Sequence, residues 1–183
     1  LPKLLKRYFI REESRLAQWL LSRADDEVAI RLCPAYINGR DYPACPIQNC
    51  GYVFWDNPLP VVAALIEYRG NVLLARNKAW PPKFFGLITG FLEKGESPEK
   101  AVVREVREEL DLDARVESMI GVYPFPEQNQ VIIAYHVLAE GEIRMGEELA
   151  EVKSVAPEKV RPWPFGSGHA VKDWLEKKRK AQG

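Results

Sequence analysis

The chain has 183 residues, of which 46% are hydrophobic, enough for one compact domain with a small additional module. Its 26 basic and 26 acidic residues give a formal net charge of zero, so composition shows no electrostatic footprint for a nucleic acid or an anionic membrane. No apolar run approaches the roughly twenty residues of a membrane-spanning helix, and no secretory signal is visible, so we expect a cytoplasmic or organellar-matrix location.

The first predicted element is a helix. Residues 11–23 place Leu16, Trp19 and Leu20 at helical spacing, which predicts an amphipathic helix with these three side chains inward. We treat residues 1–30 as an N-terminal helical segment whose role the sequence does not indicate. The start at Leu1 instead of a methionine leaves open that a leader was removed.

Residues 31–57 predict a small irregular module. The three cysteines, Cys33, Cys45 and Cys50, all fall in this stretch among prolines and aromatics, with little periodicity. A structural zinc site needs four ligands, and the two histidines, His136 and His169, lie far along the sequence. The sequence favours a module without zinc over a zinc site completed by an unusual ligand, and a disulfide is disfavoured in a reducing compartment.

From residue 60 onward the pattern becomes that of β-strands. A Gly70-Asn71 turn is expected to join the first two as a hairpin. A helix is expected at residues 98–110 and another at 170–179, where Val171, Trp174 and Leu175 form an apolar stripe. Together these elements predict an α/β fold with a mixed sheet and helices on its two faces. The predicted strands cover residues 61–68, 72–75, 86–89, 119–123, 131–138 and 151–155.

The helix expected over residues 98–110 has clear start signals. Ser97 is a good N-cap, Pro98 suits the first helical position because no amide hydrogen is needed there, and Glu99 complements the helix dipole. Apolar residues recur along this helix at helical spacing and should face the core. They are Ala101, Val102, Val106 and Leu110.

Three glutamates share another face of the same helix. Glu105, Glu108 and Glu109 stand at positions i, i+3 and i+4, where like charges repel one another. Arg104 and Arg107 can screen part of this charge, and one interpretation is a solvated acidic face with salt bridges. The other interpretation is a site for Mg²⁺ or Mn²⁺, because these ions prefer hard oxygen ligands gathered around one point.

The residues before and along this helix reproduce a known motif. Its spacing is a glycine, five residues, a glutamate, seven residues, arginine-glutamate, an aliphatic residue, any residue and two glutamates. In this chain the motif residues are Gly90, Glu96, Arg104, Glu105, Val106, Glu108 and Glu109. The pattern resembles the Nudix box, so the chain resembles a Nudix hydrolase. One position departs: the glycine expected past the helix end is Asp111, a residue type that tolerates the left-handed conformation wanted there.

The resemblance implies a fold and a metal site. The fold is a Nudix-type α/β/α sandwich with a mixed sheet over residues 58–183, preceded by the small module. The implied cofactor is Mg²⁺ or Mn²⁺. Its implied ligands are the Gly90 carbonyl and the carboxylates of Glu105, Glu108, Glu109 and Glu148, the last from outside the box. Glu108, Glu148 and Arg104 are the implied catalytic residues, with Arg104 orienting carboxylates such as Glu96.

The cysteine module carries a second resemblance. Cys33-Pro-Ala-Tyr36 followed by Cys45 and Cys50 is similar to the zinc ribbon that precedes the Nudix domain in NADH pyrophosphatases and in FAD/ADP-ribose pyrophosphatases. Two Cys-x-x-Cys pairs bind zinc in those ribbons. Here Tyr36 replaces one cysteine and the second pair is two residues too long, so we interpret residues 31–57 as a degenerate zinc-ribbon-like module that does not retain Zn²⁺.

Three residues are expected near the substrate. Phe91 and Glu93 follow the box glycine, and Phe125 lies in a Pro-Phe-Pro stretch similar to a segment of the NADH pyrophosphatases. Aromatic rings there are candidates to stack on a base, with core packing as the alternative. The expected partner is a small-molecule nucleotide, without nucleic acid or membrane, and a homodimer is left open.

The resemblance implies a divalent-metal-dependent hydrolase that cleaves the pyrophosphate bond of a nucleoside diphosphate linked to another moiety, with NAD(H), ADP-ribose or FAD as candidates. The alternative is a nucleotide-sensing or regulatory binding module that keeps the fold without turnover. The complete acidic set favours the hydrolase, because binding alone does not need it.

Overall fold

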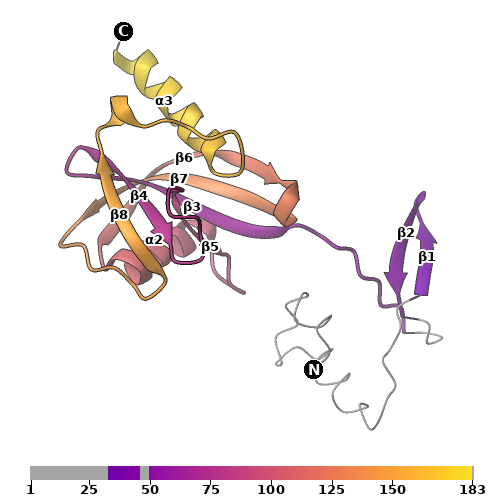
Figure 1. The fold of residues 1–183 in the computed structure, drawn as a ribbon. Helices are drawn as coiled ribbons and strands as arrows, with labels where there is room; N and C mark the ends of the chain where they lie inside the picture. The colour runs from indigo at the N-terminus through magenta and orange to yellow at the C-terminus, as the bar shows by residue number, and fades with distance from the viewer. Residues whose placement is uncertain (1–32, 46–49, 183) are drawn as a thin grey trace. The chain divides into compact units, whose positions relative to one another are not determined.

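A computed structural model describes residues 33–45 and 50–182 of the chain. It divides the chain into two compact units, Leu1–Asp56 and Asn57–Gly183, which are considered separately (Figure 1). The helix predicted over residues 11–23 lies outside the described residues. In the described part of the chain, no helix is long and apolar enough to cross a lipid bilayer.

The first unit contains a β-hairpin made of β1 (Cys33–Ile37) and β2 (Arg40–Ala44). Its two-residue turn, Asn38-Gly39, has positive φ at both positions (50° and 85°), the conformation that favours Asn-Gly in tight hairpins. The expectation of little regular structure was therefore wrong for these residues, because the Asn-Gly signal was overlooked.

The second unit is built on a six-stranded mixed sheet, as the sequence predicted. The strand order is β6-β7-β3-β4-β8, with β5 pairing beside β3. Strands β3 and β7 run parallel and the other pairs are antiparallel. The strands are β3 (Leu59–Tyr68), β4 (Asn71–Asn77), β5 (Ile88–Phe91), β6 (Asp113–Phe125), β7 (Gln130–Glu140) and β8 (Leu149–Val155).

The hairpin between β3 and β4 forms one residue earlier than predicted. Tyr68 pairs with Asn71, so the two turn residues are Arg69 and Gly70, with φ of 51° and 79°. The predicted position of the turn, Gly70-Asn71, was therefore wrong by one residue. Pairing through Asn71 adds one more residue to the ladder, although Arg69 must then adopt a left-handed conformation.

One helix covers each face of the sheet (Figure 1). Helix α2 (Pro98–Leu110) buries its predicted apolar stripe completely against the core that includes Val62 and Ile66. Helix α3 (Gly168–Gln182) packs Val171, Trp174 and Leu175 into the core of the opposite face. The predicted α/β sandwich with a mixed sheet is confirmed.

Both ends of α2 follow the sequence analysis. The Ser97 hydroxyl oxygen accepts a hydrogen bond from the Lys100 amide at 3.4 Å, and Pro98 occupies the first turn. Asp111 takes the left-handed conformation at the other end, with φ of 56°, and its amide donates to the Arg107 carbonyl at 3.0 Å. The caps set where α2 begins and ends, and its buried apolar stripe fixes the rotation of the helix and so the side from which its glutamates project.

Candidate metal and catalytic site

Gly90 on β5 and Glu105 on α2 meet where the strand passes the helix. Gly90 pairs with Val62, whose side chain belongs to the core under α2, so position 90 faces that helix. A Cβ atom at Gly90 would lie 1.9 Å from the Glu105 carboxyl carbon. Only glycine permits this approach. The structure thus brings together two of the metal ligands that the sequence suggested.

Arg104 fastens the loop after β5 to helix α2. Its guanidinium donates to both Glu96 carboxylate oxygens, from Nε to Oε1 at 2.9 Å and from Nη2 to Oε2 at 3.1 Å. Nη2 also donates to the Phe91 carbonyl at 3.2 Å. The hydrogen bonds from Arg104 hold the pKa of Glu96 below its usual value, and those contacts raise the pKa of Arg104. Through these contacts Arg104 joins Glu96 and the Phe91 carbonyl to helix α2.

The same guanidinium lies between two of the box glutamates. Arg104 Nη1 donates to Glu105 Oε1 at 2.7 Å and to Glu108 Oε2 at 3.0 Å. Within residues 33–45 and 50–182, no three His, Cys, Asp or Glu side chains are grouped closely enough to hold one metal ion in this arrangement. Arg104 Nη1 contacts one oxygen of each carboxylate, so the other oxygen, Oε2 of Glu105 and Oε1 of Glu108, is the one left for a divalent ion.

Negative charge gathers around Glu109. Burial raises the pKa of Glu109 to about 7, and repulsion from Glu105, Glu148 and Glu108 adds to the shift. Burial also raises the pKa of Glu105, although the Arg104 hydrogen bond opposes this effect. The carboxylates of α2 and Glu148 therefore act on one another electrostatically, as a shared site requires. Their oxygens are the donor type that Mg²⁺ and Mn²⁺ prefer.

The loop that carries Glu148 is tied to the end of α2. The Arg144 amide donates to the Leu110 carbonyl at 2.9 Å, and the Gly146 amide donates to the Glu109 carbonyl at 2.8 Å. These two carbonyls belong to the last turn of the helix, where intrahelical donors run out. A Cβ atom at Gly146 would lie 2.9 Å from the Glu108 carbonyl oxygen, so glycine permits the close approach.

Asn77 at the end of β4 is a site residue that the sequence analysis missed. Its Nδ2 donates to Glu148 Oε2 at 3.3 Å, and its Oδ1 accepts from the Ala79 amide at 2.9 Å. The Lys78 amide donates to the Glu148 backbone carbonyl at 2.9 Å. The sequence could have indicated Asn77 as a turn residue, because asparagine is common at the start of turns. It could not have indicated Glu148 as its partner, which lies 71 residues away.

The three expected substrate residues are less closely grouped. Phe91 pairs with Val61, whose side chain belongs to the α3 core, and Phe91 is 47% exposed. Phe125 also packs on the α3 face, stacked with Phe165 at a ring-centroid distance of 6.4 Å. Glu93 is exposed in the loop. The structure therefore places both aromatic candidates on the sheet face opposite α2, and Phe125 has a packing role.

Comparison with protein families supports the sequence resemblance. The NUDIX domain family model matches residues 57–174. ADP-ribose pyrophosphatase of Methanocaldococcus jannaschii is 31% identical over 131 residues, covering 68% of this chain and 77% of that protein. NAD-capped RNA hydrolase NudC of Mycobacterium bovis is 38% identical over 82 residues, covering 44% of this chain. That match spans 26% of the length of NudC.

Solved structures show the same fold. A NUDIX hydrolase from Nitrosomonas europaea superposes with a TM-score of 0.68 and 22% identity, covering 81% of this chain and 88% of that one. An ADP-ribose pyrophosphatase from Streptococcus suis gives a TM-score of 0.56 and 18% identity, covering 67% and 93%. With the family model spanning well over half of the chain and the motif residues assembled around Gly90, the chain belongs to the NUDIX domain family.

Proposed function

We propose that this chain is a divalent-metal-dependent pyrophosphohydrolase that cleaves a nucleoside diphosphate linked to another moiety. The observation that carries the proposal is the contact between Gly90 and the Glu105 carboxylate, beside the carboxylates of Glu108, Glu109 and Glu148. An acidic cluster of this kind is unfavourable unless a cation or a proton compensates for it. Family membership and the names of the relatives, a hydrolase and a pyrophosphatase, support the same activity.

The donor set fits Mg²⁺ or Mn²⁺. Glu105, Glu108, Glu109 and Glu148 supply carboxylate oxygens, and Gly90, which lies against the Glu105 carboxylate, supplies a backbone carbonyl. When bound, such an ion neutralises charge on the phosphate oxygens and acidifies a water molecule. These protein ligands would hold it, and no sulfur or imidazole donor is needed.

The protein groups have separable roles in this proposal. Arg104 holds the loop through Glu96 and keeps Glu105 and Glu108 oriented before metal binds. Glu148, held by Asn77, is the candidate general base or fourth metal-binding carboxylate. Glu109, with a pKa of about 7, can exchange a proton near neutral pH in the metal-free protein. Arg104 acts on other side chains and is a positioning residue here.

The substrate class is proposed from the relatives. One is named an ADP-ribose pyrophosphatase and another an NAD-capped RNA hydrolase. These names support ADP-ribose and NAD(H) as small-molecule candidates, while FAD rests on the sequence resemblance alone. NAD-capped RNA joins them, although the neutral net charge of this chain did not suggest an RNA partner.

One assay tests the proposal. The full chain is incubated with ADP-ribose, NADH, FAD and a short NAD-capped RNA, with Mg²⁺ or Mn²⁺, and released mononucleotides are measured. We expect hydrolysis of at least one substrate, loss of activity in excess EDTA and an unchanged far-ultraviolet circular dichroism spectrum. Full activity after exhaustive metal removal would contradict metal dependence. Tight binding without turnover of any substrate would favour the regulatory binding module.

A further inference from the structure

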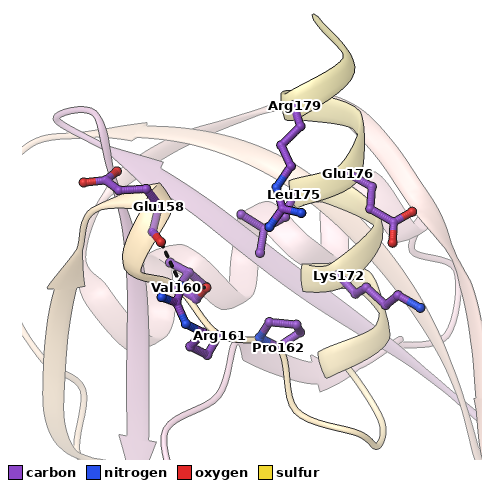
Figure 2. Close-up of a pocket in the computed structure, with 8 residues that line it drawn as sticks. All are labelled: Glu158, Val160, Arg161, Pro162, Lys172, Leu175, Glu176 and Arg179. Carbon is purple, nitrogen blue, oxygen red and sulfur yellow. Dashed lines mark hydrogen bonds between the residues drawn. The ribbon is translucent and has the colours of Figure 1, made fainter. Parts of the chain in front are cut away.

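A hollow of about 470 Å³ lies beside α3, on the sheet face opposite α2 (Figure 2). Three apolar side chains line it: Val160, Pro162 and Leu175. Val160 and Leu175 are buried in the core beneath α3, so this apolar lining is fixed in place. The volume falls in the range of small-molecule sites, about 300 to 1,000 Å³.

Arg161 and Arg179 bring positive charge to this hollow. Arg161 Nη1 donates to the Glu158 carbonyl at 2.8 Å and to the Val160 carbonyl at 3.1 Å. Its guanidinium is therefore positioned by backbone oxygens. In the part of the chain that the structure describes, neither arginine forms an ion pair with a carboxylate. Lys178 on the same helix, by contrast, lies 3.4 Å from Glu67.

The acidic side chains at the rim do not neutralise this charge. Figure 2 shows the Glu158 carboxylate pointing away from α3, while Glu176 extends outward on the other side, as Lys172 does. Arg179 instead runs back along α3 beside Leu175. The hollow thus combines two arginines with an apolar lining, and like charges at one hollow favour an anion between them.

We propose that this hollow binds a phosphate monoester with an apolar or aromatic body. Guanidinium groups match phosphate because their planar N–H forks donate two parallel hydrogen bonds. The body of the ligand would lie against Val160, Pro162 and Leu175. Mononucleotides, the products of the proposed hydrolysis, belong to this class, but binding at the hollow does not depend on that activity.

The test is a calorimetric titration of the full chain with phenyl phosphate in EDTA, which keeps metal-bound phosphate out of the carboxylate cluster. We expect saturable binding that weakens about tenfold or more in Arg161→Gln and in Arg179→Gln, since each loses a charged hydrogen-bond donor. Lys180→Gln is the matched control, because Lys180 is an exposed cation on α3 that does not line the hollow. Its affinity should stay within about twofold of wild type.

Inorganic phosphate should bind more weakly than phenyl phosphate, because it leaves the apolar lining unfilled. No saturable binding by the wild type, or equal losses in Arg179→Gln and Lys180→Gln, would overturn the proposal. Equal affinity for the two ligands would overturn the role of the apolar lining. Binding in a chain that hydrolyses no tested substrate would support the hollow and contradict the proposed function. Hydrolysis of a substrate without binding at the hollow would support the proposed function and contradict the binding site at the hollow.

Discussion

Asn77 Nδ2 and Glu148 Oε2 lie 3.3 Å apart, which joins the end of β4 to the loop before β8 at the candidate site. We predict that Asn77→Ala lowers kcat about three- to tenfold with a smaller effect on KM, because Glu148 loses its orienting donor. Steady-state kinetics on the best substrate measures kcat and KM separately. Asn71→Ala, at the opposite end of β4, is the control and should be near wild type. A change confined to KM would argue that Asn77 touches substrate instead.

Replacing Glu108 by glutamine separates the catalytic and surface interpretations of the acidic helix face. Glu108→Gln should reduce kcat by about two or more orders of magnitude if the carboxylate binds metal. Thermal stability should stay within about 0.5 kcal/mol or rise, since the lost ion pair with Arg104 is exposed and repulsion is relieved. Activity and thermal melting are measured on the same sample. Wild-type turnover with a lower melting temperature would support a salt-bridged surface helix.

Gly90→Ala should damage both the fold and the activity. The added methyl group would occupy the place of the Glu105 carboxylate, so either β5 or Glu105 must move. We expect a loss of about 1 to 3 kcal/mol in unfolding free energy, the usual effect of overpacking, and little residual turnover. Urea denaturation measures the unfolding free energy, and an activity assay measures the turnover. Gly95→Ala is an informative comparison, because Gly95 has a φ of 82° and an added Cβ there would meet nothing within 4 Å beyond its chain neighbours, so only backbone strain should appear. Equal activity in the two variants would contradict the steric argument.

The raised pKa of Glu109 predicts how stability depends on pH in the absence of metal. Its folded-state pKa is about 7 against an ordinary 4.5, so the folded protein binds more protons than the unfolded chain between these values. This contribution to stability is therefore present below about pH 4.5 and lost as pH rises to about 7. Allowing for solvent screening, the loss should be about 1 to 2 kcal/mol.

Glu109→Gln tests this pH dependence, because it removes the titrating group and should flatten the slope. Urea denaturation in EDTA at pH 5 and pH 7.5 gives the comparison, with Glu93→Gln as a control for an exposed carboxylate in the box loop. A slope that persists unchanged in Glu109→Gln would assign the effect to another group.

The sequence predicted those parts of the fold that local patterns determine. Ser97, Pro98 and the buried stripe of α2 specify that helix without reference to the rest of the chain. Strand lengths were harder to predict. Strand β6 extends over Asp113–Phe125 rather than residues 119–123, because its pairing with β7 continues past the residues with a clear apolar pattern. Residues 86 and 87 fall outside β5, since Gly86 pairs instead with Ala75 on β4.

In the candidate site, too, the sequence predicted local features and missed long-range contacts. The spacing from Gly90 to Glu109 could be recognised because the motif is contiguous along the chain. The sequence could not show that Arg104 Nη1 contacts both Glu105 and Glu108, because that depends on side-chain rotamers. Nor could it place Asn77 beside Glu148, since that contact requires β4 and β8 to pair. Long-range pairing is where local patterns carry no information.

The amide bonds from Arg144 and Gly146 to the last turn of α2 also bear on local unfolding. A free helix end frays in isolation, but here opening the final turn must also release the loop that leads to Glu148. The glutamates of α2 and Glu148 in the loop would then lose and regain their arrangement together. Hydrogen exchange should accordingly show matching protection for the Arg144 and Gly146 amides, although they stand in a loop with no regular structure of its own.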